Sequence, residues 1–367
     1  MKIKDTYYTS IWLNPNDPTC VQIIDQRQLP HMFEIKNLRT VDDACKAISE
    51  MWVRGAPLIG ATAAWGMYLG ILESPAHCTL QFYFQELYSK LLNTRPTAVN
   101  LRWAIDKMML VLSDVNTIDE AKAHSKLLAK SIMQDDIKTN SRIGEFGLEI
   151  ILDLKTQLNR TINILTHCNA GWLATVDWGT ATAPIYKAIE AGIDIHVWVD
   201  ETRPRNQGAS LTAWELLMQN IPHTLITDNA GGHLMQNGLV DMVIVGTDRT
   251  SNTGDVCNKI GTYLKALAAY DNHIPFYVAA PSSSIDWNMH DAFSELEIEE
   301  RDTHEVKYIK GKFQNKIAEV LICPEDTPAS NFSFDITPAK YITGLITERG
   351  ICEASNQGLK ELFPEKF

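Results

Sequence analysis

Cys168 lies in the sequence THCNAG at residues 166–171, directly after a short apolar run at residues 162–165. The run predicts a buried strand, and the helical pattern over residues 172–191 places the thiol at a strand-to-helix turn. Backbone N–H groups at such a turn point outward and can hold an anion. A cysteine in this partly exposed, electropositive position can do chemistry. The alternative is that Cys168, one of seven cysteines, merely fills space near the core. Position alone does not favour a chemical role over this packing role.

Asp248 is the second candidate, because it follows the apolar run at residues 242–245 by three positions. A carboxylate at the end of a buried strand is partly desolvated. Desolvation raises its pKa toward the range that suits proton transfer at neutral pH. The alternative is a helix N-cap, a common role for aspartate after a strand, and the same alternative applies to Asp228.

Small and polar residues follow five successive predicted strands, whereas the starts of these strands are unremarkable. Ligands of open α/β sheets bind outside the carboxyl ends of the strands, so this asymmetry predicts a ligand site there. The segments concerned are residues 166–171, 200–209, 227–232, 246–259 and 280–284.

The motifs of common cofactors are missing from these segments. No G-x-G-x-x-G follows the first strand and no G-x-x-x-x-G-K-[ST] occurs, which disfavours dinucleotides and nucleoside triphosphates. The ten histidines are scattered without metal-ligand spacing, so neither a metal nor another cofactor is expected. A small phosphorylated polar molecule remains as the best-fitting ligand.

Positive charge for such a ligand comes from Arg54, Arg95, Arg203, Arg205 and Lys259. The sequence RGAP at residues 54–57 joins the end of one predicted helix to the start of the next, and its N–H groups could cradle a phosphate. For Arg203 and Arg205, a solvated surface charge or a pairing with Asp200 is the alternative.

The elements that must position these residues differ between the two halves of the chain. The first half contains short strand-like runs at residues 7–13 and 21–24, which predict a hairpin or meander. Helical patterns follow, and Gly144 and Gly147 are expected to kink or divide the last of them. The patterns cover residues 41–53, 57–72, 80–92, 98–112 and 117–158.

In the second half, apolar strand patterns alternate with helical ones, which predicts a parallel, doubly wound sheet. Residues 281–318 show no clear helix and are open to interpretation as a lid, an extra hairpin or a dimer element. The strand patterns cover residues 162–165, 193–199, 223–227, 242–245, 274–279 and 319–322. The helical patterns cover residues 172–191, 211–220, 232–237 and 260–270.

The composition narrows the class of protein. A net charge of −12 without a basic cluster argues against nucleic acid as a partner. Seven cysteines without a C-x-x-C pair indicate free thiols in a reducing compartment. The start of the chain lacks the apolar core of a signal peptide, and no apolar stretch approaches membrane-spanning length. A soluble cytoplasmic protein without a membrane partner is expected.

Many motifs in one order resemble those of the 5-methylthioribose-1-phosphate isomerase family of methionine salvage. The resemblance extends over nearly the whole chain. The matching sequences are RGAPLIG (54–60), THCNAG (166–171), VDETRP (199–204), QGA (207–209), TDN (227–229), GD (254–255), NKIGTY (258–263), FYVAAP (276–281), FDITP (334–338) and ITGLITE (342–348).

The resemblance implies an α/β fold, with a helical N-terminal domain carrying short strands at residues 1–130 and a Rossmann-like catalytic domain at residues 131–367. It implies a homodimer that converts an aldose 1-phosphate to a ketose 1-phosphate. Cys168 and Asp248 become the catalytic pair. The implied substrate contacts are Arg54, Gly55, Ala56, Arg95, Gln207, Asn258 and Lys259.

The chain also departs from the family pattern. Thr247 and Thr250 replace an alanine and an apolar residue around the aspartate, residues 251–253 are atypical, and residues 172–184 are bulkier than usual. These changes leave ribose 1,5-bisphosphate and 5-deoxyribose 1-phosphate open as alternative substrates. The fold also resembles the regulatory subunits of the eukaryotic translation-initiation nucleotide exchange factor, but retention of both Cys168 and Asp248 argues against a non-catalytic regulator.

Overall fold

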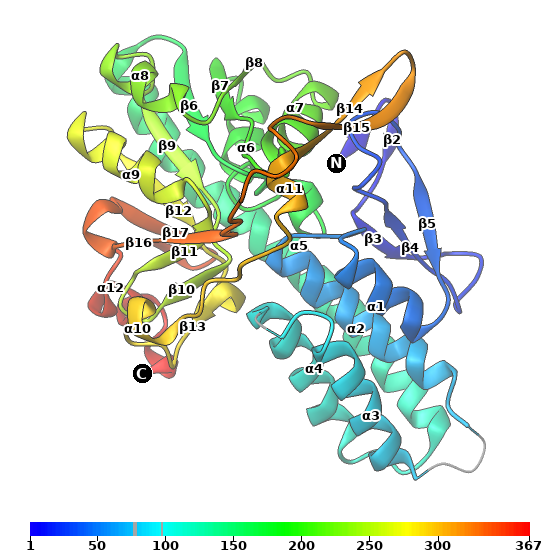
Figure 1. Cartoon of the computed structure of the whole chain (residues 1–367). Coiled ribbons are helices and arrows are strands. Elements are labelled where there is room, and N and C mark those ends of the chain that lie inside the picture. Colours follow the sequence, from blue (N-terminus) through cyan, green and yellow to red (C-terminus); the bar gives the residue numbers. More distant parts are fainter. Residues whose placement is uncertain (76–78, 97) are drawn as a thin grey trace. The chain divides into compact units, whose positions relative to one another are not determined.

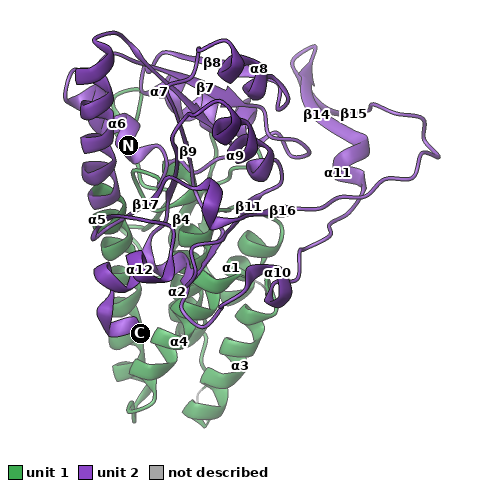
Figure 2. Ribbon diagram, turned by 90° about the vertical axis from the view of Figure 1, so that its left-hand side faces the viewer, with its two compact units in different colours: residues 1–29, 33–141, 172–179 green, residues 30–32, 142–171, 180–367 purple. Residues whose placement is uncertain are grey.

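The computed structural model describes residues 1–75, 79–96 and 98–367, so Cys78, which was expected to be a free thiol, lies outside the described residues. The chain forms two compact units (Figure 2). The first comprises residues 1–29, 33–141 and 172–179, and the second comprises residues 30–32, 142–171 and 180–367. The domain boundary predicted between residues 130 and 131 lies within helix α5 (Ile118–Leu158), before the point at which the chain enters the second unit. As a boundary between domains it stays a prediction.

The first unit combines a small antiparallel meander with a helical bundle, as the sequence predicts. The meander has the order β3-β4-β5. Its strands are β3 (Ile11–Leu13), β4 (Val21–Ile24) and β5 (Ile35–Leu38), with β1 (Lys2–Ile3) and β2 (Thr6–Tyr7) forming a separate pair. The helices are α1 (Val41–Ser49), α2 (Ala56–Leu72), α3 (Leu80–Leu92), α4 (Val99–Leu112) and the part of α5 up to residue 141.

Helix α2 is the centre of this unit. Every residue from 58 to 71 is buried, the pattern of a helix that is apolar on all sides and covered by its neighbours. Small residues let those neighbours approach: a Cβ at Gly60 would lie 2.8 Å from the Asn100 carbonyl oxygen of α4. The helix begins after Gly55, with Pro57 in its first turn, where a missing N–H costs nothing.

The second unit is built on a seven-stranded sheet in the order β18-β17-β12-β9-β6-β7-β8 (Figure 1). From β8 to β17 the strands are parallel, and β18 is antiparallel at the edge. The parallel part has the Rossmann order 3-2-1-4-5-6 along the chain. The strands are β6 (Ile162–Thr166), β7 (Ile195–Asp200), β8 (His223–Ile226), β9 (Met242–Val245), β12 (Phe276–Ala279), β17 (Gly344–Thr347) and β18 (Gly350–Cys352).

Other elements of this unit include a second sheet in the order β13-β10-β11-β16 and a separate hairpin β14-β15. Their strands are β10 (Arg249–Ser251), β11 (Val256–Lys259), β13 (Ile285–Asp286), β14 (Tyr308–Phe313), β15 (Lys316–Leu321) and β16 (Phe334–Thr337). The helices are α6 (Ala183–Glu190), α7 (Ala213–Met218), α8 (Ala230–Gln236), α9 (Thr262–Asp271), α10 (Ala292–Glu295), α11 (His304–Lys307) and α12 (Asn356–Leu362).

Three predictions about elements are wrong. The strand pattern at residues 319–322 belongs to the hairpin β14-β15 and not to the parallel sheet, whose further parallel strand is β17. The helix predicted over residues 172–191 begins only at Ala183, because Trp178 and Gly179 adopt positive φ and interrupt the helical path. Helix α5 runs without interruption past Gly144 and Gly147. These glycines serve close packing, since a Cβ at Gly147 would lie 2.2 Å from Pro184 of α6.

Within the described residues, no helix is both long enough and apolar enough to cross a membrane.

Candidate active site

Cys168 and Asp248 follow neighbouring strands of the parallel sheet. Strands β6 and β9 pair side by side, with Leu165 opposite Val243, and both point the same way. The strand order reverses at this pair, because β7 and β8 lie on one side of β6 while β9 and β12 continue on the other. Such a switch point is the usual ligand crevice of an open α/β sheet. The loops also touch, since a Cβ on Gly246 would lie 2.7 Å from the Ala170 Cβ.

The Cys168 turn is held by hydrogen bonds to both sides of its backbone. The Cys168 N–H donates to Thr202 Oγ1 over 2.8 Å, and its carbonyl oxygen accepts from Thr212 Oγ1 over 2.7 Å. Its thiol donates to Gln207 Oε1 over 3.5 Å, which brings two predicted site residues together. At 6% exposure the side chain is more enclosed than the sequence predicts.

Asp248 lies half-buried between β9 and β10, and its backbone N–H donates to the Cys257 carbonyl over 3.0 Å. Strand β10 begins at Arg249, so no helix follows, and the N-cap alternative is wrong. The adjacent departures from the family pattern compensate each other, because the Thr250 hydroxyl donates to the Thr247 hydroxyl over 3.0 Å. Burial raises the pKa of the neighbouring Cys257 thiol, which keeps that thiol neutral.

Asn258 and Lys259 lie on β11, which pairs with the strand that follows Asp248. They are 5% and 9% exposed. The Asn258 amide donates to Thr262 Oγ1 over 3.0 Å, and the Lys259 ammonium lies 4.6 Å from the centre of the Phe334 ring. Lys259 is therefore an enclosed cation on β11 of the four-stranded sheet, whose neighbouring strand β10 begins directly after Asp248.

The other predicted substrate contacts belong to the first unit. Arg54, Gly55 and Ala56 come together at the start of α2, and Arg95 follows α3, with both arginines half-buried. Gly55 has φ +92°, and a Cβ there would lie 2.3 Å from the Ala174 carbonyl oxygen. Only glycine fits this turn, because any side chain would clash with Ala174.

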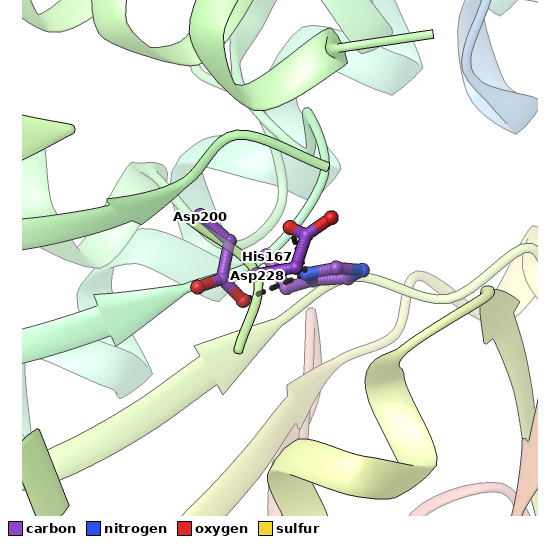
Figure 3. Close-up of side chains that lie close together, drawn as sticks. All are labelled: His167, Asp200 and Asp228. Carbon is purple, nitrogen blue, oxygen red and sulfur yellow. Dashed lines mark hydrogen bonds and ion pairs between the residues drawn. The ribbon is translucent and has the colours of Figure 1, made fainter. Parts of the chain in front are cut away.

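A buried charge cluster beside Cys168 was not foreseen from the sequence (Figure 3). The His167 ring donates from Nδ1 to Asp200 Oδ2 and from Nε2 to the Ile260 carbonyl, each over 2.8 Å. Asp228 Oδ1 lies 4.0 Å from the same Nδ1. Both ring nitrogens of His167 therefore have a hydrogen-bond partner inside the protein. The signal was present in the motif, where a histidine precedes the cysteine.

The cluster also tests whether a metal fits. Ligand atoms of His167, Asp200 and Asp228 all lie within 4.8 Å of one another. However, the Lys265 ammonium lies 3.1 Å from Asp200 Oδ2 and donates to the Asp228 carbonyl. The Lys265 ammonium therefore already neutralises the carboxylate charge that would bind a metal ion. For this reason the donor set does not fit a metal centre.

Pairing of Asp200 with Arg203 or Arg205 is wrong. Asp200 faces His167 and Lys265 instead, and Arg203 donates to the backbone oxygens of Pro204 and Val306. Arg205 pairs with Glu305 over 2.6 Å. Although burial opposes it, hydrogen bonds from Arg301 and Arg205 lower the pKa of Glu305 to about 2.

Comparison with known proteins shows which family the chain resembles along its length. The Initiation factor 2 subunit family matches residues 52–354. A methylthioribose-1-phosphate isomerase of Paramagnetospirillum magneticum is 57% identical over 100% of both chains. The crystal structure of 5-methylthioribose 1-phosphate isomerase from Pyrococcus horikoshii OT3 is 38% identical, with a TM-score of 0.84 over 100% of both chains.

A second solved structure has a different name. Subunit delta of translation initiation factor eIF-2B from A. fulgidus is 35% identical, with a TM-score of 0.79, over 98% of this chain and 99% of that chain. The isomerase relatives are more similar in sequence and match the chain from end to end. The chain therefore belongs to the methylthioribose-1-phosphate isomerases within the Initiation factor 2 subunit family.

Proposed function

We propose that this chain is an aldose–ketose isomerase that converts 5-methylthioribose 1-phosphate to 5-methylthioribulose 1-phosphate in methionine salvage, with Cys168 and Asp248 as the catalytic pair. The observation that carries the proposal is the position of both residues directly after β6 and β9, the two strands at the switch point of the sheet. A thiol and a carboxylate at one edge of the sheet are two groups that can accept protons from, and donate protons to, a single small substrate.

The substrate explains why two such groups are needed. Its anomeric oxygen is esterified to phosphate, so the ring cannot open as a free sugar does. Asp248 moves a proton on or off the ring oxygen or the 2-hydroxyl. Cys168 acts at the C1–C2 edge, either as a proton carrier or as a group that stabilises the transition state. Its thiol lies 3.5 Å from Gln207 Oε1.

Binding of the phosphate falls to basic and backbone groups. Lys259 is an enclosed ammonium on β11, the strand that pairs with β10 after Asp248, and it lies over the Phe334 ring. In the first unit, the N–H groups at the start of α2 and the side chains of Arg54 and Arg95 are further candidate anion-binding groups.

Turnover by purified variants tests the catalytic assignment. Ketose formation from 5-methylthioribose 1-phosphate is followed by NMR for the wild type, Cys168→Ser and Asp248→Asn. We expect each substitution to lower kcat by about a thousandfold, the scale for loss of a proton-transfer group. Cys352→Ser on the edge strand β18 is the matched control and retains wild-type turnover. Wild-type kcat in Cys168→Ser or Asp248→Asn would remove that residue from the pair.

The substrate class is tested with the same preparation. Ribose 1,5-bisphosphate and 5-deoxyribose 1-phosphate differ from the proposed substrate only in the group on C5. We expect the highest kcat/KM with the methylthio compound. A higher value with the bisphosphate would assign the chain to the alternative reaction while leaving the catalytic pair intact.

Two chemical routes lead from substrate to product. One removes the C2 proton to give an enol-type intermediate that is protonated at C1, and the other shifts a hydride from C2 to C1. Substrate deuterated at C2 distinguishes them. Full retention of deuterium at C1 assigns the hydride shift, and extensive washout into water excludes that shift as the sole route.

We further propose that the protein acts as a cytoplasmic homodimer. In each chain, residues 131–367 form the Rossmann-like catalytic domain. The six described cysteines are free thiols, in keeping with a reducing compartment. Sedimentation equilibrium tests the assembly, since a dimer has twice the chain mass of 41.2 kDa. A single species at the chain mass at micromolar concentration would contradict it.

A further inference from the structure

Two threonines enclose the backbone of Cys168 from opposite sides. Thr202, just after β7, accepts the Cys168 N–H at its hydroxyl oxygen over 2.8 Å. Thr212, just before α7, donates its hydroxyl to the Cys168 carbonyl over 2.7 Å. Both threonines are buried, at 0% and 1% exposure. One residue therefore has both of its backbone polar groups bound by side chains rather than by secondary structure.

This matters because Cys168 has an unfavourable backbone conformation. Its φ is +65°, a left-handed value that non-glycine residues rarely adopt. Thr202, to which it is bonded, has φ +64°, and β-branched residues are genuine outliers in this region. Such conformations persist only where the surroundings over-determine them, and they gather at functional sites.

Each threonine is held in turn by further polar groups. The Thr202 hydroxyl donates onward to the Asp200 carbonyl over 3.1 Å. The Asp228 carboxylate accepts the backbone N–H groups of Thr202 and Arg203, each over 2.7 Å. The charge cluster of His167, Asp200, Asp228 and Lys265 thus fixes the turn that carries Thr202.

On the other side, the Asn169 side-chain amide bonds to the second threonine and is itself held by the buried carboxylate of Glu215. Asn169 Nδ2 donates to Glu215 Oε1 over 2.9 Å and to Thr212 Oγ1 over 3.2 Å. Glu215 also packs against Gly171, where a Cβ would lie 1.7 Å from Oε2. The Thr212 hydroxyl therefore accepts a hydrogen bond from Asn169 and donates one to the Cys168 carbonyl, so it acts as both donor and acceptor.

We propose that Thr202 and Thr212 are positioning residues that hold Cys168 in its left-handed conformation, with the thiol directed at Gln207 and the substrate. The proposal rests on the catalytic role proposed for Cys168. The threonines touch the backbone of the cysteine and act through it.

The test compares isosteric and conservative substitutions. Thr202→Val and Thr212→Val remove the hydroxyl and keep the shape, whereas Thr202→Ser and Thr212→Ser keep the hydroxyl. Thr347→Val is the matched control, because Thr347 in β17 is equally buried but donates to the Gly350 carbonyl within its own hairpin. Circular dichroism establishes which variants are folded. Should one valine variant fail to fold, the other tests the opposite side of the same residue.

We expect kcat to fall by about 10- to 100-fold in each valine variant while KM changes by less than about threefold, since a misplacement of about 1 Å costs this much in rate. The serine variants and Thr347→Val retain wild-type kcat. A merely structural role would lower the melting temperature in the valine variants and in the Thr347→Val control alike, without this separation of kcat from KM.

A second measurement does not depend on turnover. The rate of alkylation of Cys168 by iodoacetamide, followed by peptide mass spectrometry, is expected to rise about tenfold in the valine variants as the enclosed thiol gains access to water. Folded valine variants with wild-type kcat and wild-type alkylation would overturn the positioning role. Wild-type turnover in Cys168→Ser would instead overturn the catalytic role proposed for Cys168, while the alkylation rates would still decide whether the threonines hold the turn.

Discussion

Two turns of this molecule adopt left-handed backbone conformations by different means. In the first unit, Gly55 has φ +92° and packs against Ala174 so closely that no side chain fits. In the second unit, Cys168 has φ +65° and carries a side chain, with hydrogen bonds to Thr202 and Thr212 on either side. The difference follows from what each turn presents. Under the roles proposed here, the turn at Gly55 offers only backbone N–H groups and can use glycine. The turn at Cys168 offers a thiol and must stabilise a non-glycine residue by other contacts.

Cys168→Gly separates the need for a left-handed backbone conformation from the need for a thiol, and it has the largest expected effect. Glycine adopts the left-handed conformation without steric penalty, so we expect the melting temperature to stay at or above the wild-type value. Turnover falls by about a thousandfold because the thiol is lost. Thermal unfolding and kcat are measured on the same sample. A lower melting temperature with normal turnover would show that the Cys168 side chain serves stability and not catalysis.

Gly55→Ala is the complementary change in the first unit. The new Cβ meets backbone and side-chain atoms of Ala174 at 2.3–2.6 Å and also requires an unfavourable φ. We expect a loss of about 3 kcal/mol in the free energy of unfolding, the scale of overpacking combined with backbone strain. Urea denaturation measures it. Gly192→Ala, which also has positive φ but no atom within 4 Å of its Cβ, isolates the backbone contribution and should cost less. Equal losses would show that packing against Ala174 contributes nothing.

Asp136→Asn probes how the segment opposite Gly55 is held. Asp136 Oδ2 accepts the Val176 N–H over 2.7 Å, and burial raises the pKa of this carboxyl to about 7. Between the ordinary value near 4 and pH 7 the folded state binds more protons than the unfolded state, so stability falls as the pH rises through this window. Asparagine stays neutral and keeps an acceptor.

We therefore expect Asp136→Asn to stabilise the protein by about 4 kcal/mol at pH 8 and to leave stability unchanged at pH 4. Denaturation at the two pH values measures the difference. Asp135→Asn, on the exposed neighbour, is the control. A variant that gains no stability at pH 8 would contradict the raised pKa.

The sequence predicted those parts of the fold that follow from local patterns. Uninterrupted apolar runs marked β6 and β9 to within one residue, and helical periodicity gave α2 to α5 to within one residue at each end. Cys168 and Asp248 could therefore be placed at strand ends without knowledge of the tertiary structure.

What the sequence missed depends on partners that are distant along the chain. The strand at residues 319–322 has the right composition for the sheet, but its hydrogen bonds go to the neighbouring β14. Asp200 has arginines close by in sequence, yet its charge partners are His167 and Lys265. Residues 172–182 have helical periodicity, but Trp178 adopts positive φ. Periodicity reports burial, and it does not report which group satisfies a buried charge or a backbone N–H.

The most direct test of the central claim is a double-substitution cycle on kcat with 5-methylthioribose 1-phosphate, comparing wild type, Cys168→Ser, Asp248→Asn and the double variant. Residues that serve one reaction as a unit give non-additive losses. We expect the double variant to be no slower than the slower single variant, to within about threefold. Losses that multiply, or a single variant with wild-type kcat, would contradict the claim that the ends of β6 and β9 form one catalytic site.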